Sequence, residues 1–324
     1  MRFTHIYVEE RALSYPLTGE ILNMLPDAEV IKIRHYKDVF DRKRQNAALQ
    51  KKHQALIIAV RDGNRIFRGA PVCQSFGNEN FYYASSMMNC PFDCEYCYLK
   101  GMYPSSDMVV FVNLDDYRAD VEEKLKDGPM YVCASYDTDL IAMNGLTGHA
   151  DFWKEMAKAH PDLIVELRTK AAPEITDDIS NVIYAFTLSP KEAVSRYERS
   201  TASVSTRIRA AAKALDNGAK VRLCFDPIIK FPDHETAYKE LVDEVSDVID
   251  LERLTDVSVG TFRISADYLN KMRKAYPDSA VAWYPYVIQD GVAQYDPETD
   301  RAMQEYVIGL LEKHIGREKI FTWN

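Results

Sequence analysis

From about residue 81 onward, short apolar runs alternate with amphipathic stretches, and few folds accommodate such a chain. The runs are rich in Val, Ile, Tyr, Phe and Thr, and several are nearly continuous hydrophobics, as strands buried on both faces should be. The runs are 81–88, 129–135, 163–170, 181–189, 220–229 and 255–263. Between them, apolar residues recur at three- and four-residue spacing, which is typical of helices. The helical stretches are 115–126, 148–160, 203–218, 234–249 and 265–277.

Strands separated by helices in this way predict an α/β fold with a parallel sheet, closed in part as a (β/α)6 barrel. We assign the barrel to residues 81–277. Strand-like runs in the preceding part predict a small N-terminal α/β domain at 1–80. The remainder, 278–324, should form a C-terminal hairpin and helix, because Asp290-Gly291 is a favoured hairpin turn between apolar residues.

The composition limits the class of protein. The chain has 324 residues, of which 47% are hydrophobic, enough for one large domain and a smaller one. A formal net charge of −9 argues against a surface broadly adapted to nucleic acid. The N-terminus is charged where a signal peptide needs an apolar run, and no stretch approaches the ~20 apolar residues of a membrane span. We therefore expect a cytoplasmic protein with no membrane partner.

One segment departs from this acidic average. Residues 31–53 contain eight Lys or Arg against two Asp. Such a charge run is explained by a solvated loop or helix face. It would also suit an arm that contacts phosphates.

A group of three cysteines is the most distinctive local feature. The stretch NCPFDCEYCYLKG places Cys90, Cys94 and Cys97 within eight residues, in the loop that leaves the first strand of the expected sheet. In parallel α/β folds, sites are built at this end of the strands. A long chain without a leader does not use its cysteines as a disulfide framework, so clustered thiols indicate metal binding or catalysis.

Two kinds of metal site fit three neighbouring thiols. Structural zinc takes four closed ligands; no histidine lies between His53 and His149, and Cys73 is a possible fourth ligand. An iron–sulfur cubane held by only three cysteines would instead leave one iron open for a substrate or cofactor.

The spacing C-x3-C-x-aromatic-C after the first strand resembles the signature of radical S-adenosylmethionine (SAM) enzymes. The resemblance implies one 4Fe-4S cluster held by Cys90, Cys94 and Cys97, with SAM chelated at the open iron. Reduction then releases a 5′-deoxyadenosyl radical. Tyr96 occupies the aromatic position, which packs near the adenine in that superfamily, although an aromatic side chain there could also shield a cluster from solvent.

The resemblance extends to one family within that class. Residues 6–22, 94–101, 133–135, 167–171 and 184–218 are similar, in the same order, to spore photoproduct lyase. That similarity implies repair of 5-thyminyl-5,6-dihydrothymine in DNA to two thymines. The deoxyadenosyl radical takes a hydrogen from C6 of the lesion, the methylene bridge breaks, and a cysteine returns hydrogen to the product radical.

The family match assigns roles to further residues. Cys133 matches the cysteine that returns hydrogen, and Tyr96 and Tyr98 match the tyrosines that assist it. Ser135 and Lys170 match positions that line the cofactor and lesion pocket, and Thr187 stands where the family has a serine that reaches the cofactor. Without the family match, Cys133 would be interpreted as a small core residue. That interpretation is kept for Cys224 and Cys73.

The resemblance also implies partners, with one departure. They are DNA carrying a thymine lesion and a one-electron reductant such as flavodoxin or ferredoxin. The family's late hairpin carries an Arg-Tyr pair that wedges into the duplex, whereas residues 282–300 have no such pair and an acidic tip. Two alternatives therefore stand beside the lyase: a paralogue using the same machinery on a non-duplex nucleotide, RNA base or small metabolite, and a zinc- or cluster-stabilised binding protein without catalysis.

Overall fold

The computed structural model describes residues 3–69 and 73–322, and an eight-stranded sheet forms its centre. The strand order is β18-β14-β13-β11-β10-β9-β5-β4. The bounds are β4 (Ile66–Arg68), β5 (Phe81–Ala84), β9 (Met130–Cys133), β10 (Leu163–Thr169), β11 (Val182–Thr187), β13 (Lys220–Ile228), β14 (Asp256–Thr261) and β18 (Ile320–Thr322).

The expected strands are confirmed, except that the first run, 81–88, divides into β5 and a second strand at 87–88 that belongs to another sheet. The runs that begin at 81, 129, 163, 181, 220 and 255 form β5, β9, β10, β11, β13 and β14, which are neighbours in chain order and pair in parallel. Every residue of β9, β11 and β14 is buried, which explains the continuous hydrophobic runs. Because the strands are parallel, the residues that follow them meet at one edge of the sheet, and the site described below lies there.

Helices connect these strands and cover the sheet. Their bounds are α5 (Leu114–Leu125), α6 (Leu140–Thr147), α7 (His149–Ala159), α8 (Lys191–Tyr197), α9 (Val204–Asp216) and α10 (His234–Val248). Helix α7 packs against β10, and α9 packs against β11 and β13. The side chain of Ser203 caps α9 by accepting a hydrogen bond from the Thr206 amide, and Gly218 ends the helical region with a φ of 91°.

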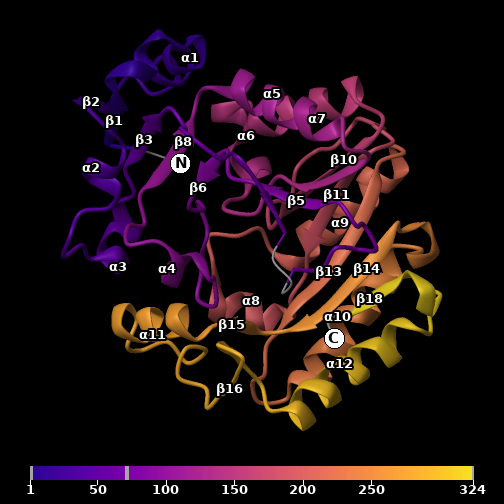
Figure 1. The fold of residues 1–324 in the computed structure, drawn as a ribbon. Coiled ribbons are helices and arrows are strands. Elements are labelled where there is room, and N and C mark those ends of the chain that lie inside the picture. The colour runs from indigo at the N-terminus through magenta and orange to yellow at the C-terminus, as the bar shows by residue number, and fades with distance from the viewer. Residues whose placement is uncertain (1–2, 70–72, 323–324) are drawn as a thin grey trace.

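A second, five-stranded sheet has the order β2-β1-β3-β8-β6. Its strands are β1 (His5–Glu9), β2 (Glu29–Ile33), β3 (Leu56–Ala59), β6 (Met87–Met88) and β8 (Met108–Phe111), and the nearby helices are α1 (Pro16–Met24), α2 (Lys37–Phe40), α3 (Ala47–Gln50) and α4 (Leu99–Met102). The sheet thus combines strands from both sides of residue 80. In Figure 1 it lies at one side of the large sheet, with β18 at the other.

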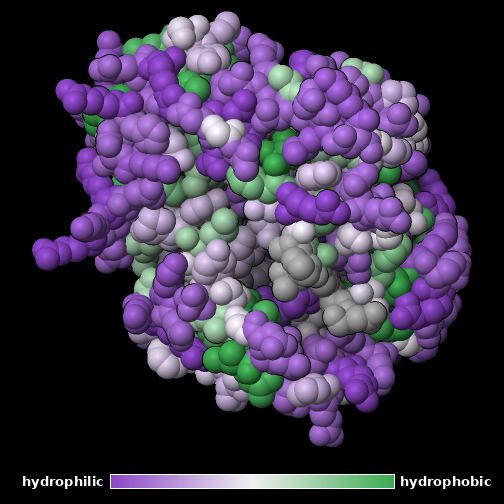
Figure 2. Space-filling view, in the orientation of Figure 1, coloured by the Kyte–Doolittle hydropathy of each residue, from purple (hydrophilic) through white to green (hydrophobic). Residues whose placement is uncertain are grey.

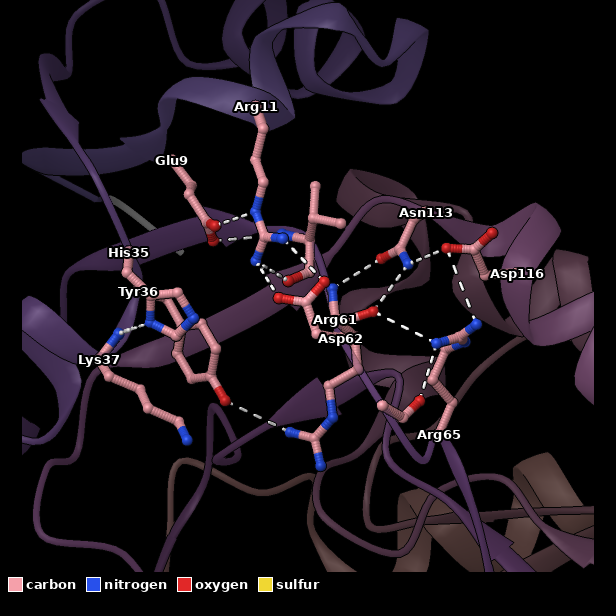
Figure 3. A network of polar contacts seen from close by, with 12 residues as sticks. Glu9, Arg11, His35, Tyr36, Lys37, Arg61, Asp62, Arg65, Asn113 and Asp116 are labelled. Atoms are coloured by element: carbon pink, nitrogen blue, oxygen red, sulfur yellow. Dashed lines mark hydrogen bonds and ion pairs between the residues drawn. The ribbon is translucent and has the colours of Figure 1, made fainter.

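A polar network fastens the small sheet to the chain that enters the large one (Figure 3). Arg11 pairs with the buried carboxylate of Glu9 and, at 2.6 Å, with Asp62. Next to them, the side chain of Asn113 donates to the Arg61 carbonyl at 3.0 Å and accepts from the Arg61 amide at 2.8 Å. These contacts satisfy backbone groups of a connection that has no strand partner of its own.

The C-terminal part forms a small three-stranded sheet and two helices. The elements are α11 (Ala266–Ala275), β15 (Arg263–Ser265), β16 (Val287–Gln289), β17 (Val292–Gln294) and α12 (Pro297–Leu311). The predicted hairpin is confirmed: β16 and β17 are antiparallel, and Asp290 and Gly291 have φ values of 50° and 79°. Apolar side chains are exposed around the hairpin, and Figure 2 shows a hydrophobic patch over the β16 region. They are Trp283, Val287 and Ile288.

Within the described residues, no helix is both long enough and apolar enough to cross a membrane.

Candidate active site

The three-cysteine loop is fixed at both ends. Asn89 adopts a left-handed conformation, with a φ of 64°, and its side-chain amide donates to the carbonyls of Ser105 and Asp107 at 2.8 and 2.7 Å. Further on, Cys94 lies in β7 (Asp93–Cys94), which pairs with β12 (Glu198–Arg199). The loop is therefore attached on one side to the segment that precedes β8 of the five-stranded sheet, and on the other side to the segment that follows α8.

Two of the cysteines lie beside the segment that follows α3. Cys90 and Cys97 line a cavity together with Lys51, whose ammonium donates to the Cys90 carbonyl at 2.6 Å. Burial raises the pKa of the Cys90 thiol to about 12 and that of the Cys94 thiol well above its ordinary value. Among the residues that the structure describes, no three His, Cys, Asp or Glu side chains converge on one point that a single metal ion could occupy.

Tyr96 is held by a buried carboxylate. Its hydroxyl donates to Glu198, which also accepts from the Ser189 hydroxyl at 2.9 Å. Arg207 of α9 pairs with the same carboxylate, and both side chains are fully buried. Arg207 also donates to the Thr187 carbonyl at 2.8 Å. One ion pair thus links the cysteine loop, the end of β11 and α9.

Removing Arg207 should be costly, because it would leave Glu198 charged, buried and unpaired. We expect Arg207→Met to lower the free energy of unfolding by about 3–5 kcal/mol. Arg196→Met is the matched control, because Arg196 forms an exposed pair with Glu192 on α8; it should cost less than about 1 kcal/mol. Urea denaturation measures both free energies of unfolding. Similar losses of stability in the two variants would contradict a stabilising role for the buried Arg207–Glu198 pair.

Lys170 approaches the same group from the end of β10. Its ammonium lies 5.5 Å from the centre of the Tyr96 ring, and its backbone amide donates to Asp139 at 2.8 Å. Burial alone would lower the pKa of Lys170, but the neighbouring Cys94 and Glu198 raise it overall. The structure therefore places Lys170 close to Tyr96, two residues that the family resemblance assigns to the cofactor.

Cys133 ends β9 and is buried. Its thiol donates to Glu166 on the neighbouring strand β10, with 3.6 Å between Sγ and Oε1. No hydrogen bond joins Cys133 to Tyr96 or Tyr98 within residues 3–69 and 73–322. Cys133, the residue expected to return hydrogen to the substrate, therefore lies at the end of β9. It is next to a carboxylate, that of Glu166, which the sequence alone did not indicate.

The loop after β9 is rich in buried polar atoms without a partner. The Ser135 hydroxyl, one carboxylate oxygen of Asp137 and the Thr138 hydroxyl accept or donate no hydrogen bond in the described part of the chain. Buried polar atoms are normally paired, so such a group calls for an ordered water or a bound ligand as its partner. Thr187, at the end of β11, is also buried.

Tyr98 contacts the segment that follows β9. Its hydroxyl donates to the Tyr136 carbonyl, and the two rings are 5.7 Å apart. The Tyr136 hydroxyl lies 3.5 Å from the sulfur of Cys73, and both of these side chains pack against the cluster that contains Cys133. Cys224 is fully buried in β13, which confirms its expected place in the core.

A parallel α/β sheet whose first strand leads into a loop of three cysteines is the arrangement of radical S-adenosylmethionine enzymes, and fold and site assign the chain to this class. Comparison with known proteins narrows the assignment. A family model described as spore photoproduct lyase matches residues 2–283. The chain belongs to the spore photoproduct lyase family.

Individual relatives agree with this assignment. A spore photoproduct lyase of Clostridium acetobutylicum is 22% identical over 295 residues, which cover 86% of this chain and 83% of the relative. A solved double mutant of spore photoproduct lyase with bound AdoMet and dinucleoside spore photoproduct is 20% identical, with a TM-score of 0.83 over 99% of this chain and 98% of the other. Spore photoproduct lyase complexed with dinucleoside spore photoproduct is 19% identical, with a TM-score of 0.81 over 99% of this chain and 98% of the other. At these identities the solved structures establish the fold.

Proposed function

We propose that this chain is a radical SAM lyase that reverts 5-thyminyl-5,6-dihydrothymine to two thymines. Family membership supports the activity, and the relatives described with AdoMet and dinucleoside spore photoproduct support the cofactor and the lesion. The observation that carries the proposal is the position of Cys133, a buried cysteine at a strand end, two residues before the unpaired hydroxyl of Ser135.

The donor set fits a 4Fe-4S cluster with one open iron. Cys90, Cys94 and Cys97 supply three thiolates, and each cysteine of a cubane binds a different iron, so the thiols need not converge on one point. When bound, the cluster and SAM supply the deoxyadenosyl radical. For the fold, we propose a partial (β/α)6 barrel at 81–277 between an N-terminal α/β domain (1–80) and a C-terminal hairpin and helix (278–324). Residues 1–2, 70–72 and 323–324 of these ranges lie outside the described residues.

The remaining site residues divide into two groups. Tyr96, Ser135, Lys170 and Thr187 would bind SAM: Lys170 lies beside the Tyr96 ring, the Ser135 hydroxyl is buried without a partner, and Thr187 ends β11. Cys133 would return hydrogen, assisted by Tyr96 and Tyr98. The S–H bond breaks, a C–H bond forms on the thymine radical, and a sulfur-centred radical remains on the protein.

Lys170 can be tested separately from the cluster. Lys170→Ala should leave iron and sulfide content unchanged, because the residue donates no bond to a cysteine thiol in the described residues. It should weaken SAM binding at least about tenfold, the effect of losing roughly 1.4 kcal/mol of charge-assisted interaction. Equilibrium binding of SAM and the visible spectrum measure the two effects; a lost cluster spectrum would show that Lys170 is structural.

The hairpin favours a second candidate substrate. Its turn contains Asp290, its exposed side chains Val287 and Ile288 are apolar, and Tyr295 is buried and unavailable as a wedge. A duplex-gripping element should carry cations, because phosphate contacts supply much of nucleic-acid affinity. The same machinery acting on a non-duplex nucleotide, RNA base or small metabolite is therefore the alternative. In both cases the proposed electron donor is a flavodoxin or ferredoxin.

One anaerobic experiment tests the function. The cluster is reconstituted, reduced with dithionite and mixed with SAM and a dinucleotide that bears the lesion. We expect 5′-deoxyadenosine together with thymidylyl-thymidine, both identified by mass. Deoxyadenosine without repaired thymine would overturn the lesion as substrate, and binding to lesion-bearing and undamaged DNA at several salt concentrations would then test the alternative.

A further inference from the structure

Cys133 and Glu166 are cross-strand neighbours. In the parallel pairing of β9 with β10, Glu166 is the register partner of Cys133. Side chains opposite each other in a sheet share one face, and the thiol donates to the carboxylate over 3.6 Å. Both residues are buried, with exposed fractions of 8% for Cys133 and 1% for Glu166, so water competes little for this contact. The geometry is set by two strands of the central sheet and not by a flexible loop.

The carboxylate is held as an anion by several donors. The Tyr131 hydroxyl and the Arg222 guanidinium donate to one oxygen, and the Arg168 Nε donates to the other at 3.1 Å. Burial alone would raise the pKa of Glu166, but Arg168 and Arg222 hold it at about 2. An ionised carboxylate has no proton to give, so the hydrogen in the contact with Cys133 belongs to sulfur.

The surroundings of the thiol act in the same direction. Burial, and after it the charge of Glu166, raise the pKa of Cys133 well above its ordinary value. The groups that face it from other elements are Glu166 and Arg168 on β10, Cys73 ahead of β5 and Tyr136 after β9; of these, Arg168 opposes the shift.

We propose that Glu166 is a positioning residue that keeps Cys133 in the hydrogen-bearing form and directs its S–H group. A thiol can transfer a hydrogen atom, breaking S–H and forming C–H, whereas a thiolate has none to transfer. Glu166 thereby ensures that the hydrogen is present whenever a substrate radical forms. The proposal rests on the proposed role of Cys133, but the protonation state itself is measurable without turnover.

The test is the pH profile of Cys133 alkylation by iodoacetamide in the holoenzyme, read by peptide mass. In wild-type protein, Cys133 should stay unmodified through pH 8.5, where an ordinary thiol ionises. In Glu166→Gln, which keeps an acceptor but removes the charge, alkylation at pH 8 should be at least about tenfold faster, one unit of pKa. An unchanged profile would overturn the proposal.

The network offers a matched control. Asp256 accepts from Arg222 at 2.8 Å, within the same buried group, but does not contact Cys133. Asp256→Asn should therefore leave the alkylation profile as in wild type. An equal shift in both variants would show that loosening of the network, and not the contact with Glu166, controls the thiol, and would overturn the proposal.

A measurement on unaltered protein covers the case in which Glu166→Gln does not fold. The S–H stretching band of Cys133, assigned by its loss in Cys133→Ala, should lie at lower frequency than that of a thiol without a hydrogen bond and persist at pH 9. A band at the free-thiol position, or its loss at that pH, would overturn the proposal.

Turnover then separates the two proposals. In wild type, the ratio of adduct to repaired thymine should not change between pH 7 and 9, and in Glu166→Gln it should rise with pH. A ratio that rises with pH in wild type as well would overturn the role of Glu166. Wild type that makes deoxyadenosine but no repaired thymine would overturn the proposed function, while the alkylation result would still decide the protonation state.

Discussion

Cys94→Ala, like Cys90→Ala and Cys97→Ala, should reduce deoxyadenosine formation to the background of protein-free controls. Each thiolate of a three-cysteine cubane holds its own iron, so no remaining ligand replaces the one removed. Cys94 is the most informative of the three, because it is buried in β7 and its register partner Glu198 holds Tyr96. Iron and sulfide content, the visible spectrum and deoxyadenosine yield after anaerobic reconstitution should all fall together.

Cys224→Ala is the matched control for these variants. Cys224 is as deeply buried as any cysteine of the chain, but it lies within β13 and not in the cysteine loop. It should retain full iron, sulfide and deoxyadenosine yield. A Cys94 variant that keeps the cluster would contradict the ligand assignment, and wild-type protein holding one zinc per chain without sulfide would refute the radical enzyme itself.

The sheet was predictable where each strand carries its own signal. The run around 181–189 is almost continuously apolar because neighbouring strands and helices bury both faces of β11, and Asp290-Gly291 encodes its turn locally. Strand β8 was not predicted. Its four residues join β3 and β6 to complete a sheet across distant parts of the chain, and this pairing depends on tertiary contacts that a short apolar run does not specify.

The residues of the candidate site likewise divide into those that the sequence indicated and those that only the tertiary structure brings together. The cysteine spacing is local and could be recognised in the sequence, and the structure places Lys170 beside Tyr96, two residues that the family resemblance assigns to the cofactor site. Glu166 and Arg222 were missed, because a single charge within an apolar strand does not reveal its partner. They come together only because β10, β11 and β13 are neighbours. A charged residue inside a continuous apolar run was the available signal, since such a charge must be paired when buried.

Cys133→Ala should separate the two halves of the reaction. The residue lies at the end of β9 and forms no hydrogen bond with the cysteine loop in the described residues, so the cluster and deoxyadenosine formation should remain at wild-type levels. The product radical, however, loses its hydrogen donor. We expect repaired thymidylyl-thymidine to fall at least about tenfold, because a well-placed hydrogen donor contributes a factor of that size or more, with adducts of the thymine radical in its place. Mass analysis of the products measures the ratio.

The same variant distinguishes hydrogen donation from packing. Truncating a buried thiol removes little volume, and Glu166 keeps Tyr131, Arg168 and Arg222 as partners, so stability should change by no more than about 1 kcal/mol. Cys224→Ala, a truncation of equal size on β13, should give the wild-type product ratio. If Cys133→Ala also gives wild-type product, the hydrogen comes from another group. If both variants give adducts, the product ratio reports packing of the sheet and not the loss of a hydrogen donor. Only Cys133 lies at the end of β9, next to the unpaired hydroxyl of Ser135, so loss of a donor should change the ratio in the Cys133 variant alone.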